Sequence, residues 1–248
     1  MILSVNTQHL TDDVLQWVQS QLEQAAKAEE KVLIGAHIPA GPAACYNCTC
    51  SNGYEGDCWA TGWQARFVSL VLQHSKTVIG VVSGHTHSDE FRVLQNSVGS
   101  VPLWIVPSLP PYNPSTNPAV RQFNTDLEHQ IVDYQQWTMD LAASNLVDEP
   151  TWSSYSPLEL YQLDSLTPEA LTALYERFWH DDDLFQVYYQ AFGSFPSIPT
   201  SCTNAWSPSV YSPHGGGGRC KAGLLCPIMM GVDESAYLAC LSSHNTST

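Results

Sequence analysis

Basic residues are scarce in this 248-residue sequence, which has 9 Lys and Arg against 24 Asp and Glu and a formal net charge of −15. Charged residues of both signs make up only 13% of the chain, about half of the usual share. Proteins that bind DNA or RNA polymers need a basic surface to neutralise phosphates, and polybasic attachment to anionic lipids has the same requirement. The composition therefore argues against a nucleic-acid polymer as partner and against a polybasic membrane contact.

Long apolar runs are also missing. No stretch approaches the ~20 apolar residues of a membrane-spanning helix, so we predict no transmembrane segment. Residues 1–8 have neither the basic start nor the apolar core of a secretory signal peptide. Hydrophobic residues nevertheless reach 44%, which is typical of a folded chain rather than a disordered one.

Cysteine is abundant for a chain of this size, and its eight copies fall into two groups of four. The groups are Cys45, Cys48, Cys50 and Cys58, and then Cys202, Cys220, Cys226 and Cys240. The Cys45–Cys48 spacing is also found in zinc knuckles, but Cys48 and Cys50 are too close for a normal zinc hairpin, so disulfides are favoured. Disulfides and the glycosylation sequons at Asn47 and Asn245 indicate an extracellular or lysosomal protein. Since such a protein starts with a signal peptide, we expect this sequence to be a mature piece or to lack its natural start.

Strand-like and helix-like segments alternate in the first half of the chain. Residues 2–5, 31–36, 77–83, 91–94, 103–106 and 130–132 are expected strands, and residues 11–27 and 63–74 are expected helices. This order predicts an α/β domain with a central sheet over residues 1–134. Residues 157–162, 167–179 and 184–192 are expected helices, so residues 135–248 are predicted to form a helical domain with disulfides.

Three histidines stand directly after buried-looking strands: His37, His85 and His87. Ligands of open α/β sheets bind beyond the carboxyl ends of the strands, and a neutral imidazole is a good metal ligand. Gly84 allows a tight turn before the histidine pair. The alternative is that these are polar loop residues with no ligand.

The flanks of the three histidines carry a resemblance. "KVLIGAHIPAG" followed by "VIGVVSGHTHSDEFRVL" resembles the last two metal-binding blocks of the calcineurin-like metallophosphoesterases, and most of all the acid sphingomyelinase and acid sphingomyelinase-like phosphodiesterase family. "PSLPPYNPSTNPAVRQF", the helices around "LYERFWHDDDLFQVYYQAF" and the cysteine-rich tail are also similar to that family. The resemblance implies the C-terminal part of a metallophosphoesterase β-sandwich with flanking helices, followed by a small helical, disulfide-bonded domain.

The resemblance also implies roles for single residues. In the family, two zinc ions bridged by an aspartate activate water for attack on a phosphodiester such as sphingomyelin or a nucleotide. His37 and His85 would bind the second zinc and His87 the first, and Tyr112 would lie near the substrate pocket or be an exposed loop aromatic. The tail cysteines would pair as Cys202–Cys220 and Cys226–Cys240, whereas the residues alone allow three pairings.

Other blocks of the family pattern do not occur in this sequence, namely Asp-x-His and Gly-Asn-His with the acid–base histidine. We therefore assign no catalytic residue and expect the isolated chain to bind at most one zinc, weakly, and to be truncated and inactive alone. The alternative function is a non-catalytic secreted binding module that keeps a remnant of the same fold.

Two further motifs have structural explanations. His180-Asp181-Asp182-Asp183 is predicted to be a helix start, with acids at the positive end of the helix dipole, rather than a calcium site. A group of aromatic side chains is predicted to form the apolar faces of packed helices rather than a lipid platform, although a peripheral lipid contact stays open: Trp152, Phe178, Trp179, Phe185 and Tyr189.

Overall fold

A computed structural model describes residues 1–7, 10–41, 59, 62–110, 116–195, 220–230 and 233–244. The strands are β1 (Ile2–Val5), β2 (Val32–Ala36), β3 (Val78–Ser83), β4 (Glu90–Gln95), β5 (Ser100–Ile105), β6 (Ala119–Thr125), β7 (Ile131–Met139) and β8 (Trp152–Tyr155). The helices are α1 (Asp12–Lys27), α2 (Trp63–Gln73), α3 (Leu141–Val147), α4 (Pro157–Tyr161), α5 (Pro168–His180), α6 (Asp182–Phe192), α7 (Cys220–Met230) and α8 (Glu234–Ser243).

The predicted central sheet is present. It has five strands in the order β1-β2-β3-β5-β4. Neighbours along β1, β2, β3 and β5 are parallel, and β4 pairs antiparallel with β5. The mixed α/β class expected from the alternating segments is therefore confirmed, and the carboxyl ends of β2 and β3 lie next to each other.

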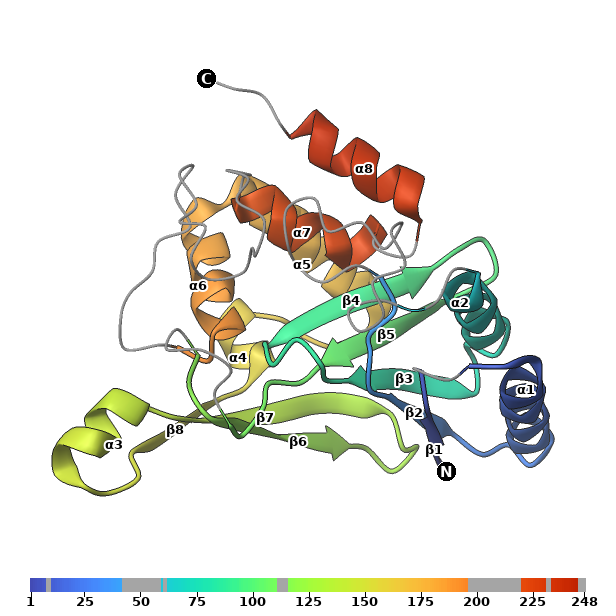
Figure 1. Cartoon of the computed structure of the whole chain (residues 1–248), viewed down its shortest axis with the longest axis horizontal. Coiled ribbons are helices and arrows are strands. Elements are labelled where there is room, and N and C mark those ends of the chain that lie inside the picture. Colours follow the sequence, from blue (N-terminus) through green and yellow to red (C-terminus); the bar gives the residue numbers. More distant parts are fainter. Residues whose placement is uncertain are drawn as a thin grey trace.

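The two faces of this sheet pack against different layers. One face, with Ile34 and Leu103, forms a single apolar cluster with α1 and α2 (Figure 1). On the other face, Phe91 and Trp104 join a second cluster that includes residues of β7 and of α4 to α7. Burial on both faces explains why the parallel strands are short, nearly continuous apolar runs.

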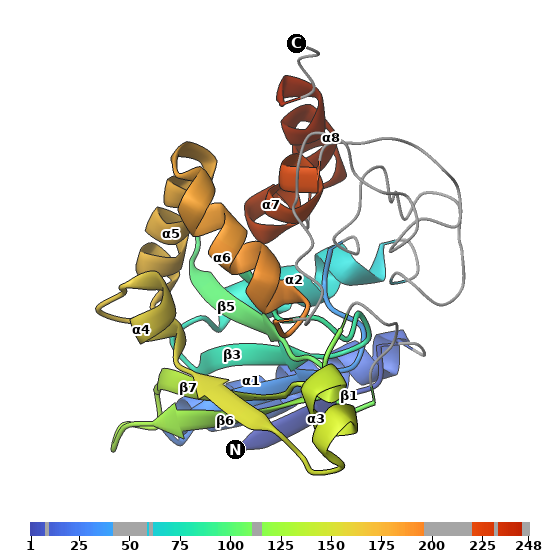
Figure 2. The same ribbon diagram turned by 90° about the vertical axis from the view of Figure 1, so that its left-hand side faces the viewer.

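A second sheet, in the order β6-β7-β8, is fully antiparallel. It packs against the first sheet, since the Trp104 ring of β5 lies 5.7 Å from Tyr134 of β7 and 6.5 Å from Phe123 of β6, between ring centroids. Figure 2 shows β6 and β7 running below β3 with α5 and α6 above. The boundary expected after residue 134 falls within β7.

The helices predicted in the second half are confirmed as α4, α5 and α6. The side chains of Thr167 and Asp181 cap α5 and α6 by accepting hydrogen bonds from the backbone N–H groups of Ala170 and Leu184. The acidic run after His180 is thus a helix start, as predicted. The prediction for Trp152 was wrong, because this residue lies on strand β8 with 43% of its surface exposed.

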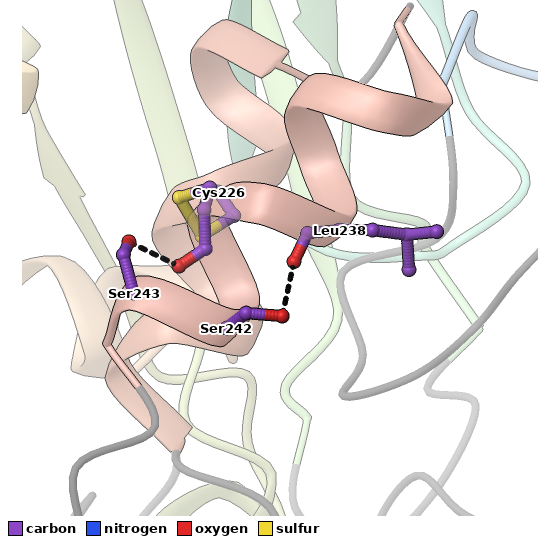
Figure 3. The surroundings of a disulfide bond; sticks show 5 residues. Cys226, Leu238, Ser242 and Ser243 are labelled. Atoms are coloured by element: carbon purple, nitrogen blue, oxygen red, sulfur yellow. Dashed lines mark hydrogen bonds between the residues drawn. A yellow bond between two sulfur atoms is a disulfide. The ribbon is translucent and has the colours of Figure 1, made fainter.

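The C-terminal helices α7 and α8 are joined by a disulfide between Cys226 and Cys240, as the family resemblance implied (Figure 3). Cys226 is completely buried, beside Tyr237 and Leu241 of α8. The Trp179 ring of α5 stacks on His244 at 3.8 Å between centroids. The disulfide therefore belongs to a small core that connects the tail to α5.

Candidate functional site

The two histidine-bearing loops meet at the carboxyl edge of the parallel strands. His37 follows the last residue of β2, and residues 84–89, which we call the GHTH loop, follow the last residue of β3. Because Gly35 and Val82 pair across these strands, the two loops begin side by side. The backbone N–H of Gly84 donates to the carbonyl of His37 at 3.0 Å, which fixes this approach.

The imidazoles of His37 and His85 are in contact. His37 Nε2 lies 3.3 Å from His85 Nδ1, and the rings are nearly perpendicular, at 82°. Two nitrogens that each lie ~2.0–2.1 Å from a tetrahedral zinc are about 3.3 Å apart, so the pair fits two ligands of one zinc ion. The same distance suits an N–H···N hydrogen bond, in which one neutral imidazole donates to the other.

Backbone strain marks the GHTH loop. His85 has a φ of 72° and His87 a φ of 60°, in the left-handed region that is uncommon for residues other than glycine, although histidine adopts it more often than most. Such strain persists only where the surroundings enforce it, and it is concentrated at binding and catalytic sites. His85 and His87 are partly buried, whereas His37 is exposed.

A buried ion pair lies beneath the two loops. Glu90 and Arg92 of β4 are 3% and 1% exposed, with Arg92 Nη2 3.6 Å from Glu90 Oε2. Burial lowers the pKa of Arg92, and the Glu90 carboxylate opposes that shift. Glu90 Oε1 accepts hydrogen bonds from the hydroxyls of Thr86, at 2.9 Å, and Ser88. Both hydroxyls belong to the GHTH loop.

A second buried ion pair connects the GHTH loop to the other sheet. Asp89 pairs with Arg121 of β6 and accepts a hydrogen bond from the hydroxyl of Tyr155 of β8. Burial, reinforced by the negative charge of Asp89, raises the pKa of Tyr155 well above its usual value. Tyr155 is therefore a neutral donor, and the loop is held from both sheets.

The structure thus brings His37 and His85 together. His87 lies two residues further along the same loop, but no group of three or more His, Cys, Asp or Glu side chains in the described residues is arranged to hold a metal. Several predicted residues lie outside the described residues: Cys45, Asn47, Cys48, Cys50, Cys58, Tyr112, Cys202 and Asn245. Cys220 begins α7, but its side chain is also outside the description.

The sequence reasoning missed the acidic and basic partners of the histidine loops. Asp89 and Glu90 lie two and three residues after His87, and Arg92 comes two residues after Glu90. A carboxylate pair next to a candidate metal ligand is a signal for outer-shell partners, so these residues could have been found. Arg121 had no such signal, because it is about thirty residues away in an undetected strand.

The fold and the histidine pair define a mixed α/β protein with two imidazoles in contact at the carboxyl ends of its parallel strands. Residues 103–247 match the family model described as "Acid sphingomyelin phosphodiesterase C-terminal region". Since this match covers more than half of the chain, the chain belongs to the acid sphingomyelinase and acid sphingomyelinase-like phosphodiesterase family. The curated relatives that it matches are named as phosphodiesterases.

Curated relatives agree with this family. The chain is 30% identical to sphingomyelin phosphodiesterase A of Dictyostelium discoideum over 79% of its length and 33% of the relative. It is 29% identical to human cyclic GMP-AMP phosphodiesterase SMPDL3A over 96% of its length and 50% of the relative. It is 26% identical to human acid sphingomyelinase-like phosphodiesterase 3b over 93% of its length and 48% of the relative. The chain spans between a third and a half of these relatives. Among the helices in the described residues, none combines the length and hydropathy that a membrane span requires.

Proposed function

We propose that this chain is the C-terminal portion of a metal-dependent phosphodiesterase, and that its two sheets are part of a metallophosphoesterase sandwich. The observation that carries the proposal is the 3.3 Å contact between His37 Nε2 and His85 Nδ1 at the carboxyl ends of two parallel strands. The family match and the packing of β6 and β7 on β5 support it. A division at residue 134 would cut β7, so the proposed sandwich extends through β8 and the proposed helical C-terminal domain follows it.

The proposed metal is zinc, with His37 and His85 as ligands of one ion and His87 as a ligand of a second. Zinc bound there would polarise the phosphodiester and help to generate a nucleophile from water at neutral or mildly acidic pH. The contribution of this chain is to present two imidazole nitrogens at a fixed separation. The GHTH loop places His85 beside His37, and Glu90 accepts hydrogen bonds from two hydroxyls of this loop.

The proposed substrates are small phosphodiesters, either sphingomyelin or a nucleotide, since the relatives are named for sphingomyelin and for cyclic GMP-AMP. The proposed location is extracellular or lysosomal, and the Cys226–Cys240 disulfide is in keeping with such an oxidising compartment. Because the Asp-x-His and Gly-Asn-His blocks do not occur in the 248 residues, we propose that the isolated chain has no phosphodiesterase activity.

A chimera tests this function. The segment of human cyclic GMP-AMP phosphodiesterase SMPDL3A that aligns with this chain would be replaced by the chain itself. We expect zinc-dependent hydrolysis of cyclic GMP-AMP that is abolished by His85→Ala. His129→Ala is the matched control, because His129 is an exposed turn residue with a similarly positive φ of 62°.

Two results would count against the proposal. One is a chimera whose activity survives both His37→Ala and His85→Ala. The other concerns the isolated chain, which would be assayed with zinc and a chromogenic phosphodiester. Robust turnover of the isolated chain that His85→Ala abolishes would show that it is active alone, contrary to the proposal.

A further inference from the structure

We propose that Glu90 and Arg92 form a positioning clamp that holds the imidazoles of His37 and His85 at their 3.3 Å separation. Neither residue is a metal ligand in this proposal, and neither touches substrate. Both act through the backbone and hydroxyl groups of the loops that carry the histidines. The inference rests on the proposed function only in treating His37 and His85 as metal ligands.

The Arg92 end of the clamp reaches the loop of His37. Arg92 Nη1 donates a hydrogen bond to the backbone carbonyl of Ala40, three residues after His37. Arg92 Nη2 faces the Glu90 carboxylate at 3.6 Å. One planar guanidinium therefore contacts the His37 loop with one nitrogen and Glu90 with the other.

The Glu90 end reaches the GHTH loop. Glu90 Oε1 accepts from the hydroxyl of Thr86, which lies between His85 and His87 in the chain, and from the hydroxyl of Ser88. The Ser88 hydroxyl also lies 2.7 Å from the Thr86 hydroxyl. A single carboxylate oxygen thus holds the loop at Thr86 and Ser88. These two residues flank His87 and follow His85, the two loop residues with left-handed backbone geometry.

Stability alone is a poor reason for such a pair. Replacing a buried ion pair by well-packed apolar side chains is often neutral or stabilising, because taking two charges out of water is costly. A fork of two donors, in contrast, gives fixed geometry. The clamp joins two loops that are about fifty residues apart in sequence, and those loops carry the two histidines that are in contact.

Arg92→Lys is the sharpest variant. Lysine keeps the positive charge opposite Glu90, but its single ammonium group cannot reproduce the two separate contacts of the guanidinium. Glu90→Gln is the second variant, since it removes the charge at nearly constant shape. Thr86→Val is the third variant, because it removes one hydroxyl contact with Glu90 and leaves the ion pair in place. It provides a test of the clamp even if the two charge variants fail to fold.

Two controls match these changes. Arg66→Lys alters an exposed ion pair with Asp12, which links α2 to α1 and includes neither histidine loop. Arg121→Lys alters a buried ion pair of the same kind, but one that connects the GHTH loop to β6 and not to the His37 loop. Arg121→Lys therefore controls for a general loss of stability.

The readout needs no metal and no activity. In the isotope-labelled full chain, nuclear Overhauser effects between the ring protons of His37 and His85 report their contact, with assignments from His37→Gln and His85→Gln. We expect this contact in the wild type and in both controls, and its loss in each folded clamp variant. Zinc affinity, measured by competition with a chromogenic chelator, should fall by about 10–100-fold in the clamp variants, as for other outer-shell partners.

The two proposals fail in different ways. A ring contact that persists in folded clamp variants, or that Arg121→Lys removes equally, overturns the clamp whatever the zinc result. If the wild type and His85→Ala bind zinc with the same affinity, the proposed function is contradicted. In that case, loss of the ring contact in the clamp variants would still support the clamp.

Discussion

At the scale of single residues, Asp89 of the GHTH loop is a buried carboxylate surrounded by hydrogen-bond donors. It is 4% exposed and accepts hydrogen bonds from Arg121 and Tyr155, and the hydroxyl of Tyr134 lies 3.5 Å away. The Arg121 guanidinium also lies 3.9 Å from the centre of the Tyr134 ring. Removing the carboxylate would leave the guanidinium buried and without its counter-charge.

We therefore predict that Asp89→Ala lowers the free energy of unfolding by about 3–5 kcal/mol, as is typical when one partner of a buried ion pair is removed. Urea denaturation measures this loss. Asp12→Ala is the control, because Asp12 pairs with Arg66 at 2.6 Å on the surface, where such pairs contribute at most about 1 kcal/mol. Equal losses in the two variants would contradict the stated role of Asp89.

At the scale of secondary-structure elements, Lys221 connects three helices. Its ammonium group, near the start of α7, donates to Asp182 at the start of α6 at 2.6 Å and to the carbonyl of Trp179 in α5 at 3.3 Å. The hydrogen bond and the charge of Lys221 lower the pKa of the exposed Asp182 carboxyl. Charge on both groups is therefore favoured at mildly acidic pH.

This contact predicts a pH dependence. Since the pKa of Asp182 is lower in the folded than in the unfolded chain, its contribution to stability is present above the unfolded value of about 3.9. It disappears as the pH falls through the lower folded value. Asp182→Asn should thus reduce stability at pH 5–7, by less than about 1 kcal/mol for so exposed a pair, and have no effect in strong acid.

Thermal unfolding across this pH range measures the effect. Asp183→Asn is the control, because it removes a charge from the same helical turn without removing the Lys221 contact. The assignment fails if Asp182→Asn and Asp183→Asn have the same pH profile.

The disulfide gives a second prediction at this scale. Cys226 and Cys240 are 14 residues apart, and a cross-link that closes such a loop contributes roughly 3 kcal/mol. The double variant Cys226→Ala/Cys240→Ala should therefore unfold at a clearly lower denaturant concentration, with α7 and α8 affected first. Ser243→Ala is the control, since it removes only a hydrogen bond to the Cys240 carbonyl (Figure 3). Unchanged stability of the double variant would contradict this role.

The sequence was sufficient for the parallel sheet, for α4 to α6 and for the position of the histidines, because these depend on local apolar runs and helix caps. It was insufficient for β6. In this strand Arg121 and Phe123 face the first sheet, whereas Val120 faces outward with 47% of its surface exposed. The usual alternation of apolar and polar residues is therefore reversed at Arg121, whose buried charge is balanced by Asp89 of the GHTH loop, about thirty residues earlier in the chain.

For the candidate site, the sequence predicted where the histidines lie but not how far apart they are. Strand ends indicated where His37 and His85 would lie, since parallel strands bring their carboxyl ends to one edge. Their mutual distance was not predictable, because it depends on contacts between distant segments. The hydrogen bond from Arg92 to the Ala40 carbonyl is such a contact.

At the scale of the whole molecule, the chain is a layered α/β structure with the histidine pair at one edge of its larger sheet. The helices α1 and α2 cover one face, and the second sheet with α4 to α7 covers the other (Figure 1). The central claim is that this edge holds a zinc ion between His37 and His85, as part of a phosphodiesterase. The relatives are about two to three times as long as this chain.

Zinc binding by the purified chain tests this claim most directly. Chelator competition and metal analysis would be carried out on the wild type, His37→Ala, His85→Ala and the control His129→Ala. The account predicts one weakly bound zinc per chain, lost in either of the first two variants and retained in the control. Two tightly bound zinc ions per chain, or equal binding in all four proteins, would contradict it.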